Sequence, residues 1–167
     1  MFRRGMLFSV LGLMAGVATL LLSQDVLAKD LTSRLGVGIK SNSLDIPALA
    51  VVYYPNADFG ITGGLGIDTQ KDASRLTANG GFRRILFREE HMNFYFGGQA
   101  AIVNYETVGN KQSGFELNAV FGAEFFFTGL DSLAFTFEGG AGVTSMKDVR
   151  FHTIADHPFK AGIIFYF

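Results

Sequence analysis

Near the end of the chain, two histidines and an aspartate lie close together and are the residues best suited to chemistry. His152, Asp156 and His157 fall in a polar segment that we expect to be a loop. Such a cluster could bind a divalent metal or assist hydrolysis, because imidazole and carboxylate groups serve as metal ligands and general bases. Solvated loop residues of these types are far commoner than sites, and His91 stands alone in another turn. We therefore expect no catalytic residue and no metal.

Two other sequence patterns resemble catalytic or binding sites, but their predicted geometry excludes both functions. Glu116 and Glu124 belong to one extended segment, and their spacing puts them about 26 Å apart, too far to share a substrate bond. The glycine-rich sequences at 63–66 and 139–142 look like phosphate-cradling loops, but no helical pattern follows either of them. Inside strands, glycine permits tight curvature instead. No cofactor is predicted.

Composition limits the elements that could position these residues. The chain has 167 residues, 49% of them hydrophobic, with 18 Phe, 21 Gly and neither Cys nor Trp. Without cysteine there is no disulfide and no thiolate metal site. A formal net charge of −1 argues against nucleic-acid binding, which needs clustered positive charge.

The first 28 residues have the pattern of a Sec signal peptide. Arg3 and Arg4 precede an uncharged, largely apolar run from Leu7 to Leu22, and Val26 and Ala28 suit a cleavage site. The run is shorter than the roughly 20 apolar residues that a retained membrane helix needs. We expect residues 1–28 to be cleaved and residues 29–167 to form one domain.

Beyond residue 28 the strongest pattern is alternation of apolar and polar residues at period two. From Phe115 to Phe127 one face carries phenylalanine, leucine and alanine, while the other carries Glu116, Asn118 and Glu124. Such alternation is typical of a β-strand with two different faces. No uncharged segment of the mature chain is long enough for a spanning helix. The predicted fold class is all-β.

The same alternation predicts eight strands joined by connections of unequal length. The strands are expected at about 31–40, 47–54, 59–68, 75–87, 93–105, 115–127, 133–145 and 157–167. Short turns follow the second, fourth and sixth strands, and longer polar links follow the odd-numbered ones, the longest at 106–114 and 146–156. Short periplasmic turns opposite longer outer loops, on an even number of strands, indicate an antiparallel up-and-down transmembrane β-barrel.

A soluble lipocalin-like barrel is the alternative, and it would turn its apolar face inward. The predicted polar face carries several basic and acidic groups, which are costly to bury unless they are paired, and the opposite face carries many phenylalanines. For a water-soluble chain this distribution is unfavourable. It favours a membrane barrel with the apolar face toward lipid.

The last strand adds a local signal, because Phe159, Ala161, Ile163, Phe165 and Phe167 alternate up to the C-terminal residue. With the signal peptide and the eight-strand pattern, this resembles the small bacterial outer-membrane barrels of the OmpA/OmpX type. The resemblance implies a location in the bacterial outer membrane and an assembly signal, formed by Phe165 and Phe167, for the barrel-assembly machinery. Without Trp, the aromatic girdles would consist of Tyr53, Tyr54, Tyr105, Phe94, Phe127 and Phe167.

We predict that the charged residues of the polar face pair inside the barrel. The interior of an eight-stranded barrel is only just wide enough for side chains to fill it, so opposite charges at similar heights can reach each other. Tyr95 and Gln99 would add polar filling, and the lumen would be plugged. The predicted network comprises Arg34, Arg75, Arg83, Glu116, Glu124, Glu138 and Lys160.

Small residues on the lipid-facing side predict lateral association. Leucine or valine would suit acyl chains better, whereas small residues let a neighbouring protein pack closely, although curvature control is an alternative for the glycines. The predicted oligomer and lipid face comprises Gly63, Gly80, Gly98, Ala100, Ala123, Gly139 and Ala141. It resembles the porin-like, oligomeric, lipid-trapping barrels of bacterial predators, the PopA type, which implies homo-oligomers in contact with outer-membrane lipid.

The sequence therefore predicts a non-enzymatic outer-membrane barrel, porin-like in class, with a plugged lumen and homo-oligomers that organise or trap lipid. A monomeric adhesin-like surface barrel is the main alternative. A lipid A-modifying enzyme and a small-solute pore are weaker ones, because position 154 is Ile where lipid A deacylases carry a serine, and because open channels normally need 16 or more strands.

Overall fold

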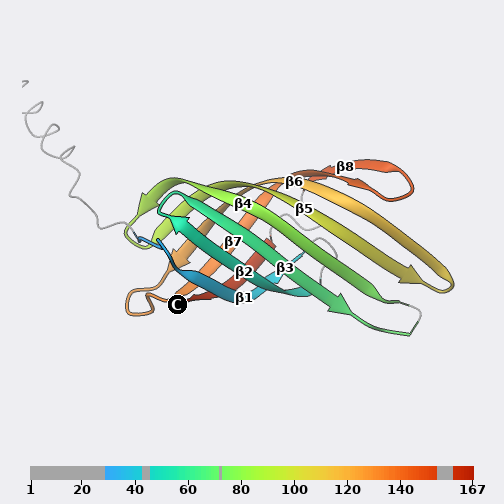
Figure 1. The fold of residues 1–167 in the computed structure, drawn as a ribbon, viewed down its shortest axis with the longest axis horizontal. Coiled ribbons are helices and arrows are strands. Elements are labelled where there is room, and N and C mark those ends of the chain that lie inside the picture. Colours follow the sequence, from blue (N-terminus) through green and yellow to red (C-terminus); the bar gives the residue numbers. More distant parts are fainter. Residues whose placement is uncertain (1–28, 43–45, 72, 154–159) are drawn as a thin grey trace, which may run out of the picture.

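The computed structural model describes residues 29–42, 46–71, 73–153 and 160–167, and these residues form nine β-strands (Figure 1). The predicted signal peptide, residues 1–28, lies outside the described residues. Within the described ranges, no helix is long and apolar enough to cross a membrane. The strands are β1 (Leu35–Ser41), β2 (Pro47–Asn56), β3 (Phe59–Asp68), β4 (Arg75–Glu89), β5 (Met92–Thr107), β6 (Asn110–Phe126), β7 (Leu133–Ser145), β8 (Val149–Thr153) and β9 (Lys160–Tyr166).

Eight of these strands close into an antiparallel ring. Consecutive strands pair from β1 to β7, β7 pairs with β9, and β9 returns to β1, where Val37 lies opposite Phe165. The remaining strand, β8, pairs with the end of β7. The predicted eight-stranded up-and-down barrel is confirmed, and the first seven predicted strands match β1 to β7 apart from their ends.

The two faces of the barrel differ as the alternation predicts. Along β6, Glu116 and Glu124 are buried in the interior, whereas Phe115 and Phe121 point outward and are each 51% exposed. Arg83 is likewise buried, and the outward faces of the other ring strands also carry large exposed apolar side chains. This is the orientation of a transmembrane barrel, and it is the reverse of a soluble carrier with an apolar interior.

The short turns at one end of the barrel are built from local hydrogen bonds. Between β2 and β3, Asn56 Oδ1 accepts hydrogen bonds from the backbone N–H groups of Asp58 and Phe59, both at 3.0 Å. Asparagine is favoured in turns because its side chain can replace a backbone acceptor in this way. Between β6 and β7, Gly129 has a φ of 84°, which glycine adopts without steric cost. Residues 29–34 and the C-terminal Phe167 lie at the end of the barrel that carries these turns (Figure 1).

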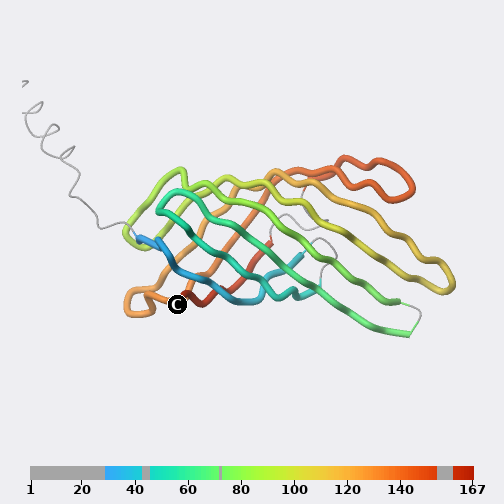
Figure 2. Tube along the Cα trace, viewed as in Figure 1, coloured from blue at the N-terminus to red at the C-terminus, as the bar shows by residue number. Residues whose placement is uncertain are grey.

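At the opposite end, two predicted links are wrong. β5 continues to Thr107 and β6 begins at Asn110, so the predicted link 106–114 is a tight hairpin, and the predicted link 146–156 contains β8. Alternation misses the extensions of β5 and β6 because strand pairing depends on backbone hydrogen bonds and continues where the side chains become polar. The hairpins β5–β6 and β7–β8 project beyond the ends of β1 and β2 (Figure 2).

The predicted aromatic girdle is wrong at two tyrosines. Tyr54 is fully buried in the barrel interior. Tyr105 shares the inward face of β5 with the buried Val103, and the guanidinium of Arg75 lies 5.6 Å from its ring centre. Both tyrosines follow the alternation of their own strands, in which Tyr53 and Ile102 point outward.

Candidate functional site

Arg83 is the centre of a polar network inside the barrel. It lies on the inward face of β4 and is 1% exposed. One guanidinium nitrogen donates to Glu124 Oε1 at 2.6 Å, and the other donates to Glu138 Oε1 at 3.0 Å. The guanidinium also lies 4.4 Å from the ring centre of Tyr95, a cation–π distance. Arg83 therefore joins a carboxylate from β6 to a carboxylate from β7.

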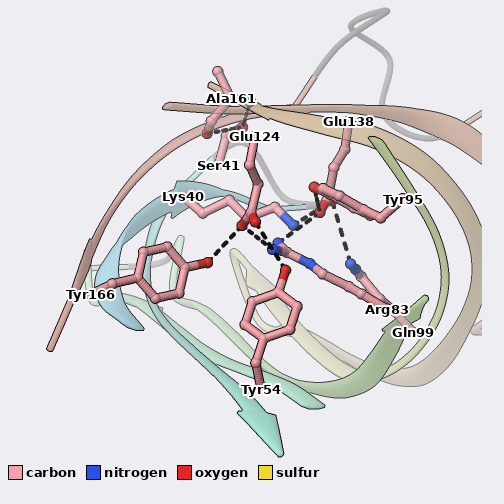
Figure 3. A network of polar contacts seen from close by, with 10 residues as sticks. All are labelled: Lys40, Ser41, Tyr54, Arg83, Tyr95, Gln99, Glu124, Glu138, Ala161 and Tyr166. Carbon is pink, nitrogen blue, oxygen red and sulfur yellow. Dashed lines mark hydrogen bonds and ion pairs between the residues drawn. The ribbon is translucent and has the colours of Figure 1, made fainter. Parts of the chain in front are cut away.

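The carboxylates of Glu124 and Glu138 also accept hydrogen bonds from hydroxyl, ammonium and amide groups of other strands (Figure 3). Glu124 accepts hydrogen bonds from the hydroxyls of Tyr54 at 2.9 Å and Tyr166 at 2.7 Å. Glu138 accepts from the hydroxyl of Tyr95 at 2.7 Å, and it also pairs with the ammonium of Lys40 and contacts the amide of Gln99.

This Arg83 network, defined as Arg83, Glu124, Glu138, Lys40, Gln99, Tyr54, Tyr95 and Tyr166, draws on every strand of the ring except β3. Buried carboxylates are tolerated where charged and hydrogen-bonding partners satisfy them, and both carboxylates here meet that condition. The side chains reach across the interior of the ring, so the network ties distant strands together.

Inward-facing glycines provide the space that the three tyrosines fill. A Cβ atom placed on Gly60 would lie 2.8 Å from the Tyr54 ring. A Cβ on Gly122 would lie 2.6 Å from the Tyr95 ring, and one on Gly36 would lie 2.6 Å from the Tyr166 ring. Each ring thus lies directly against the backbone of a neighbouring strand, which only glycine permits at these positions.

The structure brings together three of the seven residues of the predicted network, which are Arg83, Glu124 and Glu138. Lys160 is buried opposite Glu138 in the β7–β9 pairing. Arg75 is half-buried against Tyr105, and Arg34 is half-buried ahead of β1.

Glu116 belongs to a second inward group, nearer the projecting hairpins. Its carboxylate accepts from the amide of Asn118 and from Thr144 Oγ1 at 3.5 Å. Thr144 Oγ1 also lies 2.6 Å from His152 Nε2. His152, expected in a solvated loop, is thus on the inward side of β8, which pairs with β7.

Three members of the Arg83 network are absent from the predicted network, namely Lys40, Tyr54 and Tyr166. Their inward direction follows from alternation, because Ile39, Tyr53 and Phe165, the residues next to them, point outward. The signal was therefore present, but Lys40 lies near a strand end and Tyr54 was assigned to the girdle.

The segment with His152, Asp156 and His157, which was considered and rejected as a metal site, is only partly within the described residues. Asp156 and His157 lie outside them. In the described part of the chain, no group of three or more His, Cys, Asp or Glu side chains could hold a metal ion. His91, at the other end of the barrel, lies 3.3 Å from Thr128 Oγ1 in a turn.

A groove of about 540 Å³ crosses the outer face of β4 to β7. Four residues of the predicted small-residue face line it, namely Gly80, Gly98, Ala100 and Ala141. Larger side chains, among them Phe82, Leu117 and Phe151, complete its lining. We call this depression the small-residue groove.

The other three members of the predicted face lie outside the groove lining. Gly63 is opposite Gly80 in the β3–β4 pairing, and Gly139 is opposite Phe121. Ala123 is only 9% exposed. Within the groove the two glycines differ, because Gly98 is covered by the ring of Phe82, whereas a Cβ on Gly80 would meet no atom closer than 3.9 Å.

Replacing Tyr166 by Phe should lower the free energy of unfolding by about 1.5–3 kcal/mol, because Glu124 would lose a buried charged hydrogen bond. The same change at Tyr53, whose side chain points outward, should cost less than about 0.5 kcal/mol. Urea unfolding of both variants in detergent micelles measures the difference. Equal effects would show that the Tyr166 hydroxyl does not stabilise the barrel.

Comparison with known proteins supports the fold. No known protein-family profile matches the chain, and no curated protein matches it. Among solved structures, the N-terminal β-barrel domain of OprF from Pseudomonas aeruginosa is similar, with a TM-score of 0.58 and 11% sequence identity over 80% of this chain and 96% of that chain. At this identity the likeness concerns the fold alone. The chain therefore has the fold of the small, eight-stranded OmpA/OmpX-like barrels.

Proposed function

We propose that this chain is a non-enzymatic barrel of the bacterial outer membrane that is plugged inside and associates with copies of itself and with lipid through its outer face. The observation that carries the proposal is the small-residue groove. Its floor of glycine and alanine, which is exposed at Gly80 and Ala100, lies on the face that carries the exposed apolar side chains. Close backbone approach is the property that small residues add to such a surface.

The Arg83 network supports the plugged lumen. Its side chains come from most strands of the ring, and the cavity next to it has a volume of only about 30 Å³. An eight-stranded barrel leaves little space beyond its own side chains. In planar bilayers we therefore expect no discrete conductance steps, and regular steps would contradict the plugged lumen.

Homo-oligomers of plugged barrels would act by enclosing membrane between subunits. The exposed apolar faces of β1, β7 and β9 form a second groove, of about 830 Å³, that includes Ile39, Phe135, Phe137 and Ile163. This apolar surface suits acyl chains, which fill shallow depressions between aromatic side chains. Delivery to the membrane would use the terminal residues Phe165 and Phe167, which both point outward from the last strand, as the signal for the barrel-assembly machinery.

Purification in mild detergent tests the proposal directly. We expect a particle mass of at least two chains, measured by light scattering with the detergent contribution subtracted, and co-purifying phospholipid identified by mass spectrometry. A lipid-free monomer would contradict self-association and lipid binding while leaving the barrel fold intact.

Replacing Ala100 by Leu should reduce the oligomer fraction at least about tenfold, because leucine fills the floor of the small-residue groove. Ala161→Leu is the matched control. It is also an exposed, outward alanine, but it lines the groove on β1, β7 and β9. Light scattering of the two variants compares the faces. If only Ala161→Leu reduced the oligomer fraction, the subunit interface would lie at the groove on β1, β7 and β9 instead.

A second candidate function, adhesion, is favoured by the projecting hairpins. Val108 at the tip of β5–β6 and Val149 on β8 are 78% and 75% exposed. Exposed apolar side chains at the ends of projecting hairpins can contact another surface. Replacing both valines by Ser should abolish attachment of expressing cells if the barrel is an adhesin, and should leave attachment unchanged if it is not.

A further inference from the structure

We propose that Arg84, on the outer face of β4, binds the phosphate group of a membrane phospholipid. Arg84 follows Arg83 in the sequence, but strand alternation turns it outward, where it is exposed, whereas Arg83 points into the barrel (Figure 3). This contact rests on the proposed lipid binding, and it adds the residue that recognises the lipid and the part of the lipid that is recognised.

The surroundings of Arg84 on the outer face are apolar. In the strand pairing it lies opposite Phe59 of β3 and Phe96 of β5. Along β4 its outward neighbours are Phe82 and Leu86. All four of these side chains are exposed, by 37% to 46%. The guanidinium therefore lies within an apolar surface of the kind that contacts acyl chains in a membrane barrel.

Arg84 differs in position from the other outward charges of the ring. In the described ring strands, alternation turns three other charged side chains outward, and each lies within two residues of a hairpin: Glu89, Glu106 and Lys111. Arg84 is five residues before the end of β4, and the exposed Phe87 lies between. At about 3.3 Å per residue and a tilt of about 45°, the separation in height is about 12 Å. Arg84 is therefore inside the apolar belt.

A charge at this depth needs a partner, because a cation in hydrocarbon is costly unless it is paired. Within the described part of the chain, no hydrogen bond or ion pair joins the Arg84 guanidinium to another group. The long arginine side chain can extend along the apolar surface toward the headgroups. The phosphate of a phospholipid is the anion found at that level, and a guanidinium can bind it through two parallel hydrogen bonds.

A second copy of the chain is a poorer partner for Arg84. The outward carboxylates of the described ring strands, Glu89 and Glu106, lie at strand ends, one at each end of the barrel. Glu106 also pairs with Lys111 at 3.3 Å. The described outer face of a neighbouring barrel thus presents no carboxylate at the depth of Arg84. Charge complementarity therefore favours the phosphate of a lipid over a second barrel.

Native mass spectrometry of the barrel in nonionic detergent measures the binding of added lipid. The probes are dioleoylphosphatidylglycerol and dioleoylglycerol, which have the same acyl chains, but only the first carries a phosphate. A charged hydrogen-bonded pair should make the affinity for dioleoylphosphatidylglycerol about tenfold higher. Equal affinities for the two lipids would overturn the proposal.

Two variants assign the difference to one residue. Arg84→Met should lower the affinity for dioleoylphosphatidylglycerol about tenfold and leave the affinity for dioleoylglycerol unchanged. Lys111→Met, the matched control, removes an outward cation that already has a carboxylate partner and should change neither affinity. Similar losses in both variants would reveal a general attraction to anionic lipid and count against the proposal.

These measurements also distinguish failure of this proposal from failure of lipid binding. If the wild-type barrel and Arg84→Met bind dioleoylphosphatidylglycerol equally, Arg84 does not recognise the phosphate, while the proposed lipid binding stands. If the wild-type barrel binds neither lipid, the proposed lipid binding fails and the role of Arg84 fails with it.

Urea unfolding from phosphatidylglycerol vesicles gives a second readout, in which the sign of the effect decides. Arg84→Met should lower the urea midpoint by about 0.5 M or more, because the folded barrel loses its contact with phosphate. In micelles of a phosphate-free detergent the same change should leave the midpoint nearly unchanged. Without a phosphate partner, removing a charge from the apolar belt would instead raise the midpoint in vesicles. A raised or unchanged midpoint in vesicles would overturn the proposal.

Discussion

Replacing Arg83 by Met should lower the free energy of unfolding by about 3–5 kcal/mol, the largest stability effect that we expect from any single interior change. Methionine has a similar length but no charge, so Glu124 loses its only ion-pair partner among the described residues. Glu138 keeps Lys40 but loses its second cation. A buried carboxylate without a cation is costly because the interior does not replace the water that it loses on folding.

Arg84 provides an unusually close control for this experiment. It follows Arg83 in the sequence, but strand alternation turns it outward, where it is exposed. Arg84→Met should change the stability by less than about 0.5 kcal/mol. Urea unfolding in micelles, read from the gel mobility that distinguishes folded from unfolded barrels, measures both variants. Similar losses for the two arginines would mean that the Arg83 network does not stabilise the barrel.

A double variant separates the loss of the Arg83–Glu124 ion pair from the loss of the Arg83 side chain itself. Glu124→Gln keeps an acceptor for the hydroxyls of Tyr54 and Tyr166 but removes the charge that Arg83 neutralises. Combined with Arg83→Met, it should recover at least about 1 kcal/mol relative to Arg83→Met alone. Additive losses would show that the two side chains act independently.

Much of the fold could be predicted from the sequence because one physical property, the side-chain period of a strand, governs it. Segment 115–127 carries its phenylalanines and glutamates on opposite faces, and β6 buries the glutamates as predicted. The same alternation located the Arg83, Glu124 and Glu138 side chains in the interior. Each strand has one polar and one apolar face, so the remaining question is whether the apolar face lies inside the barrel or outside it. The large number of phenylalanines on that face favours contact with lipid on the outside.

The partners within the interior could not be predicted in the same way. Contact across a barrel depends on the stagger between strands, and the sequence does not state how far each strand is shifted along its neighbour. Arg75 and Glu116 both belong to the predicted charge network, yet Arg75 lies against Tyr105, whereas Glu116 bonds to Asn118 and Thr144. The hairpin containing β8 was missed for a different reason. Val149 and Phe151 do alternate with Arg150 and His152, but β8 has only five residues and lies within a segment that was assigned to a link.

The length of the apolar face along β6 agrees with the thickness of a bilayer. Phe115 and Phe127 are both exposed and outward, and strand geometry puts them about 40 Å apart along the chain. At the tilt of about 45° that barrel strands adopt, this corresponds to a height of about 28 Å, close to the hydrocarbon thickness of a membrane. Phe121 lies midway between them and should therefore face the centre of the bilayer.

Phe121→Arg should consequently destabilise the barrel folded into phospholipid vesicles by about 2–4 kcal/mol, whereas Phe127→Arg, at the edge of the apolar face, should destabilise it by only about 0–1 kcal/mol. Phe121→Ala corrects for the lost packing against Phe94, whose ring centre is 6.3 Å away. Urea titrations of the three variants in vesicles give the comparison. On a water-facing surface the two arginine variants would have similar, small effects, since arginine is well solvated there. A strong dependence on position along β6 is therefore specific to hydrocarbon, and its absence would contradict the placement of this face in a membrane.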